Sequence, residues 1–186
     1  MEINKDQLNI VDEADQVIGI ASRKEIHQKG LLHREIHIIF YTPDGQLIFQ
    51  HRAKDKDSYP DLLDVTVGGH VEIGSDYLAT AIIEAKEETG VDILPEQLKA
   101  LKRVRTNHYD DATGVTNNTI RQVYAYRYLG QLSDLVVEEG KALGFVAYPL
   151  SALTSFTNQE KSRFIPAIFS SLGQEILAAV EKEIKG

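Results

Sequence analysis

Residues 68–91 hold the feature that most constrains this chain, a glycine-rich turn followed by a helix that ends in a cluster of glutamates. Glu84, Glu87 and Glu88 fall within one narrow arc, because each residue turns a helix by about 100°. Like charges at this spacing repel one another and weaken the helix. A bound cation would remove that repulsion, and an all-oxygen, multiply anionic site suits Mg²⁺ or Mn²⁺.

The alternative interpretation of this cluster is a solvated acidic helix face without a ligand. Its surroundings favour the metal site. Leu78, Ala81, Ile82 and Ala85 form a separate apolar stripe, so the glutamates border a buried face and do not replace it. Gly90 can take the left-handed conformation that ends a helix. The glycines ahead of the helix allow the main chain to approach a ligand closely, and these are Gly68, Gly69 and Gly74.

The segment resembles the Nudix box, whose pattern is Gly, five residues, Glu, seven residues, Arg-Glu, an aliphatic residue, any residue, Glu-Glu, any residue, Gly and an aliphatic residue. The matching residues here are Gly69, Glu84, Ala85, Glu87, Glu88, Gly90 and Val91. Two positions depart from the pattern, since Ser75 replaces the first Glu and Ile83 replaces the Arg. The resemblance is strong because the matched pattern is long and tightly spaced.

In the family, that Arg and the first Glu belong to an ion-pair network that orients the helix glutamates. Because this chain lacks both the Arg and the first Glu, one positive and one negative charge are lost together, and neither charge remains without its ion-pair partner. The resemblance implies Glu84, Glu87 and Glu88 as metal ligands and catalytic residues, with the Gly69 carbonyl as a further ligand. Ser75 is expected to cap the helix through its hydroxyl.

Composition limits the classes of function. The 186 residues suit one domain, and a hydrophobic content of 42% is enough for a sizeable core. Twenty basic and 28 acidic residues give a net charge of −8, which argues against nonspecific binding to nucleic acid or anionic membranes. The polar start and the lack of a long apolar run predict a cytoplasmic protein. The absence of cysteine excludes disulfides, thiolate metal sites and a cysteine nucleophile.

The hydrophobic pattern predicts an α/β fold with a mixed sheet covered on both faces. An N-terminal extension, residues 1–30, contains two short strands within 8–21 and a helix that ends at Gly30. A Nudix domain, residues 31–186, begins with a hairpin over 37–53 that turns at Pro43-Asp44-Gly45. We expect further strands at 100–106, 120–129 and 143–150 and a C-terminal helix over about 162–184. The resemblance, from His33 to Leu172, implies the family's α/β/α sandwich.

Several residues outside the helix are candidates for the site. Glu139 lies where some Nudix proteins carry a metal-binding or general-base Glu before an aromatic strand, and Glu138 is the neighbouring alternative. The predicted substrate-binding residues are Arg52, Lys54, His70 and Arg105. Exposed basic residues often have no specific role, and Glu139 is equally consistent with an ordinary acidic loop. The polar segment 106–119, between two strands, is expected to be a loop in which Tyr109, Asn117 and Asn118 could contact a base.

The resemblance implies a metal-dependent Nudix pyrophosphohydrolase, with Mg²⁺ or Mn²⁺ as cofactor and a nucleoside diphosphate derivative or similar small diphosphate as substrate. Such a metal polarises phosphate oxygens and lowers the pKa of a bound water, whose proton a carboxylate then takes. No nucleic acid or membrane partner is expected, and a homodimer is left open.

Two alternatives come from different classes. The chain is also similar to isopentenyl-diphosphate isomerase, a Nudix relative that uses histidines and glutamates to hold a metal and a cysteine near its Gly-His. His33 and His70 match two of those histidines, although either is equally consistent with a structural role, and Gly68 takes the place of the cysteine. The second alternative is a Nudix-like module that binds a nucleotide without turning it over, which the two departures from the box favour.

Overall fold

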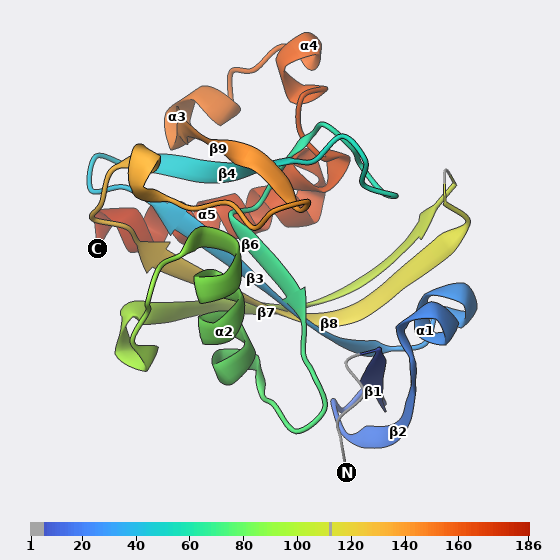
Figure 1. The fold of residues 1–186 in the computed structure, drawn as a ribbon. Helices are drawn as coiled ribbons and strands as arrows, with labels where there is room; N and C mark the ends of the chain where they lie inside the picture. Colours follow the sequence, from blue (N-terminus) through green and yellow to red (C-terminus); the bar gives the residue numbers. More distant parts are fainter. Residues whose placement is uncertain (1–5, 112) are drawn as a thin grey trace.

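The computed structural model describes residues 6–111 and 113–186, which form one mixed sheet with helices on both faces, as predicted (Figure 1). The strands are β1 (Gln7–Val11), β2 (Val17–Ser22), β3 (His33–Tyr41), β4 (Gln46–Arg52), β5 (Leu63–Asp64), β6 (Val67–His70), β7 (Leu98–Asp110), β8 (Val115–Arg127) and β9 (Ala142–Pro149). The α-helices are α1 (Arg23–Lys29), α2 (Tyr77–Thr89), α3 (Leu150–Leu153), α4 (Asn158–Lys161) and α5 (Ser171–Lys185), with 3₁₀ turns η1 (Pro95–Gln97), η2 (Leu132–Asp134) and η3 (Pro166–Phe169).

The strand β3 is the centre of the sheet. It pairs in parallel with β8 and antiparallel with β1, β4 and β6. The β3–β4 pairing covers only the residues next to the hairpin turn, after which the two strands diverge and β6 pairs with β3 in place of β4. Thr66 joins the diverging strands, because its hydroxyl accepts a hydrogen bond from the Phe40 amide at 2.9 Å and donates one to the Ile48 carbonyl. We call this divergence the fork.

Alternate residues of β3 point to opposite faces of the sheet. Ile36 and Ile38 belong to a core that includes Ala81 and Ala85 of α2, so we call this side the α2 face. Residues such as Ile39 belong to a second core that includes the C-terminal helix, and we call that side the α5 face. The two faces have separate apolar cores, which confirms the three-layered arrangement.

The N-terminal strands and α1 form a lobe on the edge of the sheet, with a small core of their own from Leu8, Ala21 and Ile26. Ser22 caps α1 by accepting a hydrogen bond from the Glu25 amide. Gly30 ends the helix with a φ of 62°, and this end was predicted. β1 pairs with β2 and touches β3 at a single register, Ile10 with His33. The β7–β8 hairpin curves away from the body of the protein towards α1 (Figure 1).

Two expectations about the elements were wrong. The polar segment 106–119 is not one long loop, because β7 runs to Asp110 and β8 begins at Val115, with paired residues such as Asn107 and Asn118. A polar hairpin that leaves the core lacks the apolar alternation that marks a strand. The C-terminal helix begins at Ser171 and not near 162, because Pro166 opens η3 and Ser170 caps α5 through the Gly173 amide.

In the part of the chain that the structure describes, no helix has both the length and the apolar character needed to cross a membrane.

Candidate active site

Helix α2, which carries the glutamate cluster, is fixed at both ends by capping residues. Its first turn is capped by Asp76, whose side chain accepts a hydrogen bond from the Ala79 amide at 2.8 Å. The expectation that Ser75 is the cap was therefore wrong by one residue, and the Ser75 hydroxyl lies 3.0 Å from that of Thr80. Gly90 ends the helix with a φ of 74°, as predicted. These caps fix the register of the residues between them against the sheet.

Glu84 lies directly against Gly69 of β6. A Cβ atom at position 69 would stand less than 3.0 Å from the Glu84 carboxyl group, a distance that real side chains do not adopt. The glycine therefore leaves the space that the Glu84 carboxyl group occupies, and it is not needed for an unusual backbone angle.

Glu88 is only 5% exposed and lies in the fork. Its carboxylate accepts hydrogen bonds from Gln50 Nε2 and from the Gly68 amide, both at 3.3 Å. That amide is available because β4 has separated from β3, so the strand edge at Gly68 points at the helix and not at another strand. The fork thus gives a buried carboxylate a donor from the main chain.

The charge of this cluster is only partly balanced. Lys141 Nζ lies 3.7 Å from Glu88 and 2.7 Å from Glu138, at the side of the cluster. Burial nevertheless raises the pKa of Glu84 to about 7 and that of Glu88 to about 7, against the opposing effect of Lys141. A buried oxygen-rich site whose carboxylates resist ionisation gains most from a hard divalent cation, so these residues fit Mg²⁺ or Mn²⁺.

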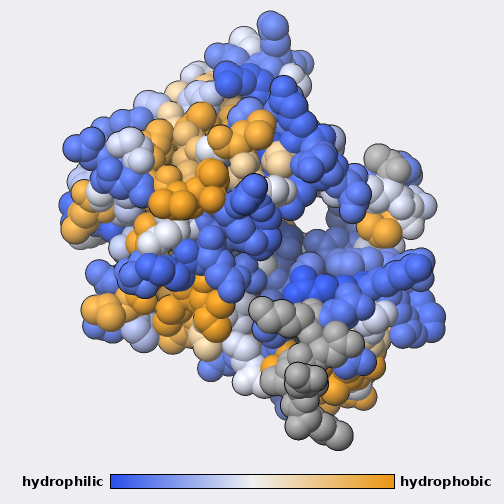
Figure 2. Space-filling model, viewed as in Figure 1, coloured by the Kyte–Doolittle hydropathy of each residue, from blue (hydrophilic) through white to orange (hydrophobic). Residues whose placement is uncertain are grey.

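The remaining box positions lie nearer to solvent. Glu87 is exposed, and its charge is one of the causes that raise the pKa of Glu84. Ile83, where the family has Arg, is 53% exposed, and Figure 2 shows apolar side chains gathered over α2 on this face. An arginine at position 83 would therefore meet no steric barrier.

Of the two acidic candidates before β9, Glu138 is the one in the cluster. It is half-buried, pairs with Lys141 and contributes to the raised pKa of Glu84, whereas Glu139 is exposed. Lys141 and Gln50 were missed by sequence reasoning. Only the charge imbalance of the glutamates signalled that a cation must lie near them, and nothing in the sequence indicated which one.

The predicted substrate-binding residues are not gathered around the glutamates. The Arg52 guanidinium donates to the Tyr59 and Ser58 carbonyls of the loop 53–62 and to the Asp64 carboxylate of β5, the last at 3.0 Å. Lys54 is exposed on that loop. Arg105 binds Glu13 of the N-terminal lobe and Asn118 of β8. His70 points to the α5 face, because it pairs with Glu35 and is one residue beyond Gly69.

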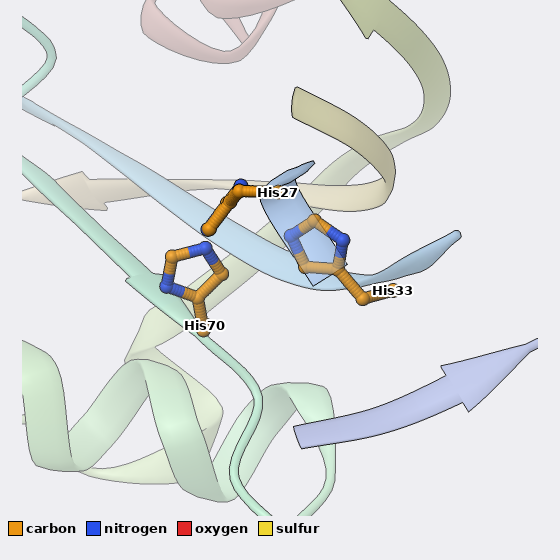
Figure 3. Close-up of side chains that lie close together, drawn as sticks. All are labelled: His27, His33 and His70. Carbon is orange, nitrogen blue, oxygen red and sulfur yellow. The ribbon is translucent and has the colours of Figure 1, made fainter. Parts of the chain in front are cut away.

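A second cluster lies on that α5 face. His27 of α1, His33 of β3 and His70 of β6 each offer a ring nitrogen, and these three atoms lie within 4.8 Å of one another (Figure 3). Burial lowers the pKa of all three imidazoles, that of His70 to about 3. The rings are therefore uncharged at neutral pH. His27 was missed, because the sequence does not show that α1 packs against β8 and so brings His27 to His33.

A known domain family and several known proteins match most of this sequence. The NUDIX domain model matches residues 31–168. An uncharacterized Nudix hydrolase of Clostridium acetobutylicum is 28% identical over 159 residues, covering 82% of this chain and 74% of its own. An uncharacterized Nudix hydrolase of Streptomyces coelicolor is 36% identical over 131 residues, covering 70% of this chain and 69% of its own.

Crystal structures confirm the fold. A Deinococcus radiodurans protein superposes with a TM-score of 0.70 at 21% identity, covering 91% of this chain and 98% of its own. A bifunctional NMN adenylyltransferase/ADP ribose pyrophosphatase from Francisella tularensis, complexed with AMP and Mn ion, superposes with a TM-score of 0.55 at 16% identity. That match covers 82% of this chain and 42% of the Francisella chain.

Proposed function

Because the chain belongs to the Nudix hydrolase family, we propose that it cleaves the phosphoanhydride bond of a nucleoside diphosphate derivative in a reaction that requires Mg²⁺ or Mn²⁺. The observation that carries this proposal is the pair of carboxylates of half-buried Glu84 and buried Glu88, which lie against Gly69 and Gly68 of β6 and have pKa values of about 7. The Francisella protein, with AMP and Mn in its structure, supports the choice of ligand class and metal.

In this proposal, Glu84, Glu87 and Glu88 hold the metal, with the Gly69 carbonyl as an additional ligand. A divalent ion bound there supplies positive charge to the phosphate oxygens and lowers the pKa of a coordinated water. Gln50 and the Gly68 amide orient Glu88 by donating to one of its oxygens. The remaining oxygen of Glu88 faces Lys141, whose side chain is about one-third exposed and can reach an anionic substrate.

We assign the general base to Glu138, which lies beside the cluster and is not buried within it. Its carboxylate lies 2.7 Å from Lys141 Nζ, next to Glu88, where it can accept a proton from a water molecule that attacks the substrate. The box glutamates then remain available for the metal. Glu139, one residue further on, is the alternative base, and comparison of Glu138→Gln with Glu139→Gln separates the two. The rate should fall much more for the residue that acts as the base.

The decisive experiment is a screen of nucleoside diphosphate derivatives, ADP-ribose among them, with Mg²⁺ or Mn²⁺ in ¹⁸O-labelled water. We expect cleavage at the anhydride and incorporation of the label into a product phosphate, since water is the nucleophile. The variant Glu84→Gln/Glu88→Gln controls for contaminating activity and should be inactive.

The isomerase alternative predicts a different outcome in the same experiment. The three clustered histidines favour it, whereas Gly68 provides no acid where the isomerase has a cysteine. An isomerase would move the double bond of isopentenyl diphosphate and exchange carbon-bound hydrogen with deuterated water, leaving the diphosphate intact. Isomerisation would overturn the hydrolase proposal, and tight nucleotide binding without any turnover would replace it with the sensor alternative.

A further inference from the structure

The turn between β1 and β2 carries a carboxylate that contacts three other elements of the fold. Asp15 Oδ1 lies 2.6 Å from Arg34 Nε of β3, and Asp15 Oδ2 lies 3.2 Å from Arg103 Nη1 of β7. Both oxygens lie 3.1 Å from the hydroxyl of Tyr77, the first residue of α2. Given the hydrolase function proposed above, on which this inference rests, we infer that Asp15 is a positioning residue, which holds α2 through Tyr77 and thereby orients its glutamates.

Tyr77 lies on the same side of α2 as Glu84 and Glu88. At about 100° per residue, positions 84 and 88 both fall within about 20° of position 77 around the helix axis. At about 1.5 Å per residue, the two glutamates follow roughly 10 to 17 Å further along that axis. A rotation of the helix that displaced Tyr77 would therefore turn both carboxylates through the same angle.

The ring and the hydroxyl of Tyr77 are both fixed by neighbours outside α2. The residue is buried in the α2-face core, and Cζ of Arg103 and Cζ of Arg34 lie 4.6 Å and 5.7 Å from the ring centroid, within the range of a cation–π contact. The hydroxyl donates to Asp15, because a carboxylate only accepts. Burial, and then the charge of Asp15, raise the pKa of Tyr77, so the donated proton is retained.

Helix α2 carries no charged residue of its own that could do this work near its start. Its first turn contains no acidic side chain. The two box positions that depart from the pattern, Ser75 and Ile83, are both uncharged, so neither forms an ion pair. Asp15 supplies the charged contact from another element of the fold, and Tyr77 connects that contact to the helix.

The backbone of Asp15 allows its side chain to be tested separately from its turn. Asp15 has a φ of 61°, a left-handed conformation that glycine adopts without strain. The turn is also held by Asp12, whose carboxylate accepts hydrogen bonds from the Ala14 and Gln16 amides, both at 2.9 Å. Glycine at position 15 should therefore keep the turn and remove only the carboxylate.

Tyr77→Phe is the key variant, because it removes one hydroxyl and no charge. The ring stays in the core, and the ion pairs of Asp15 with Arg34 and Arg103 stay in place. Tyr126→Phe is the matched control, since Tyr126 belongs to the same core and its hydroxyl is not bonded to Asp15. Both variants should fold, and near-ultraviolet circular dichroism checks this.

Three measurements on the whole chain separate a positioning role from a merely structural one. In Tyr77→Phe, amide hydrogen exchange of residues 77–89 should be faster than in the wild type by about threefold or more. Mg²⁺ affinity and kcat at saturating Mg²⁺ should each fall about 10-fold. KM should change less than about threefold, because Tyr77 orients the glutamates and does not hold the substrate. Tyr126→Phe should match the wild type in all three.

Variants of Asp15 test the other side of the same contact. Asp15→Gly should lose at least as much Mg²⁺ affinity and kcat as Tyr77→Phe, and Asp15→Asn should lose less, because its amide oxygen still accepts from the Tyr77 hydroxyl. Adding Tyr77→Phe to Asp15→Gly should add little, since both remove one interaction.

Two results would overturn the inference. One is exchange of residues 77–89 in Tyr77→Phe that equals that of Tyr126→Phe. The other is a loss of stability in Tyr77→Phe without a change in kcat or Mg²⁺ affinity, which would make the role of Tyr77 structural. If the wild type cleaves no diphosphate and binds no Mg²⁺, the proposed function fails, and the exchange of residues 77–89 still decides whether Asp15 holds α2 through Tyr77.

Discussion

The two faces of the sheet carry clusters built from opposite chemistry under similar burial. On the α2 face, burial raises the pKa of Glu84 and Glu88, and on the α5 face it lowers the pKa of His33 and His70. Both changes favour the neutral form of the side chain. The comparison shows that burial in one fold can favour the neutral form of an acidic cluster on one face of the sheet and of a basic cluster on the other.

The largest expected effect is a difference in hydrolytic activity between variants on the two faces of the sheet. Glu88→Gln should lower kcat/KM for the phosphoanhydride substrate by roughly 10²–10³-fold, because stabilisation of the charge that develops on phosphate is lost. His27→Ala should change it less than about threefold, since its side chain lies on the other face. Initial rates at saturating Mg²⁺ measure both. A large loss of hydrolysis in His27→Ala would show that the two clusters act together.

A pair of neighbouring glycines gives a sharper contrast within one strand. Gly69→Ala should lower Mg²⁺ affinity by about 10-fold or more, because the new Cβ collides with the Glu84 carboxyl group. Gly68→Ala places its Cβ 3.3 Å from His37 on the α5 face and should affect Mg²⁺ binding little. Calorimetric titration of both variants measures the difference. Equal affinities would mean that Glu84 is not held by its approach to β6.

The pH dependence of stability should have opposite signs for the two clusters in the metal-free protein. The pKa of Glu88 is about 7 when folded and lower when unfolded, so its contribution to stability falls as pH rises from about 4.5 to 7. The pKa of His70 is about 3 when folded and about 6.5 when unfolded, so its contribution falls as pH drops through that range.

Removing either group should therefore change the slope in a defined direction. Glu88→Gln should make stability rise more steeply with pH, and His70→Gln should make it rise less steeply, each by up to about 1.4 kcal/mol per pH unit. Denaturant unfolding between pH 4.5 and 7 in the presence of a chelator measures both. Slopes that shift in the same direction would contradict the opposite pKa changes.

The smallest expected effect concerns the two departures from the box. Ser75→Glu with Ile83→Arg should raise kcat/KM more than the two single changes combined, by a coupling of about 0.5 kcal/mol. The coupling is small because Ile83 is exposed and an ion pair there is screened by water. A double-mutant cycle measures it. Strictly additive effects would show that the caps and close packing of α2 orient its glutamates without that ion pair.

How far the sequence predicted the structure depended on whether the signal was local. The hairpin around Gly45 and the end of α1 at Gly30 were predicted, because turn and cap residues act within a few positions of themselves. The prediction that Glu84 and Glu88 share one side of a helix was made in the same way, from their spacing along the chain. The start of α5 was wrong, because a Pro-initiated 3₁₀ turn interrupts an apolar pattern that continues through it.

Residues that meet only in the folded protein were not predicted. Gln50 is 38 positions from the Glu88 that it contacts, and Lys141 is 53 positions away. His27 is close to His33 in sequence, yet its position depends on α1 folding back over the sheet. No periodic pattern signals such a contact, because periodicity reports which side of an element is buried and not what lies opposite.

The fork held by Thr66 also affects how this site tolerates change during evolution. It leaves the Gly68 amide as a donor to Glu88, and that donor belongs to the main chain. A substitution other than proline alters a side chain and leaves the amide in place. Part of the glutamate site is therefore encoded by strand pairing and not by residue identity. Distant sequences that preserve the fork can preserve this donor even where little else in the neighbourhood remains the same.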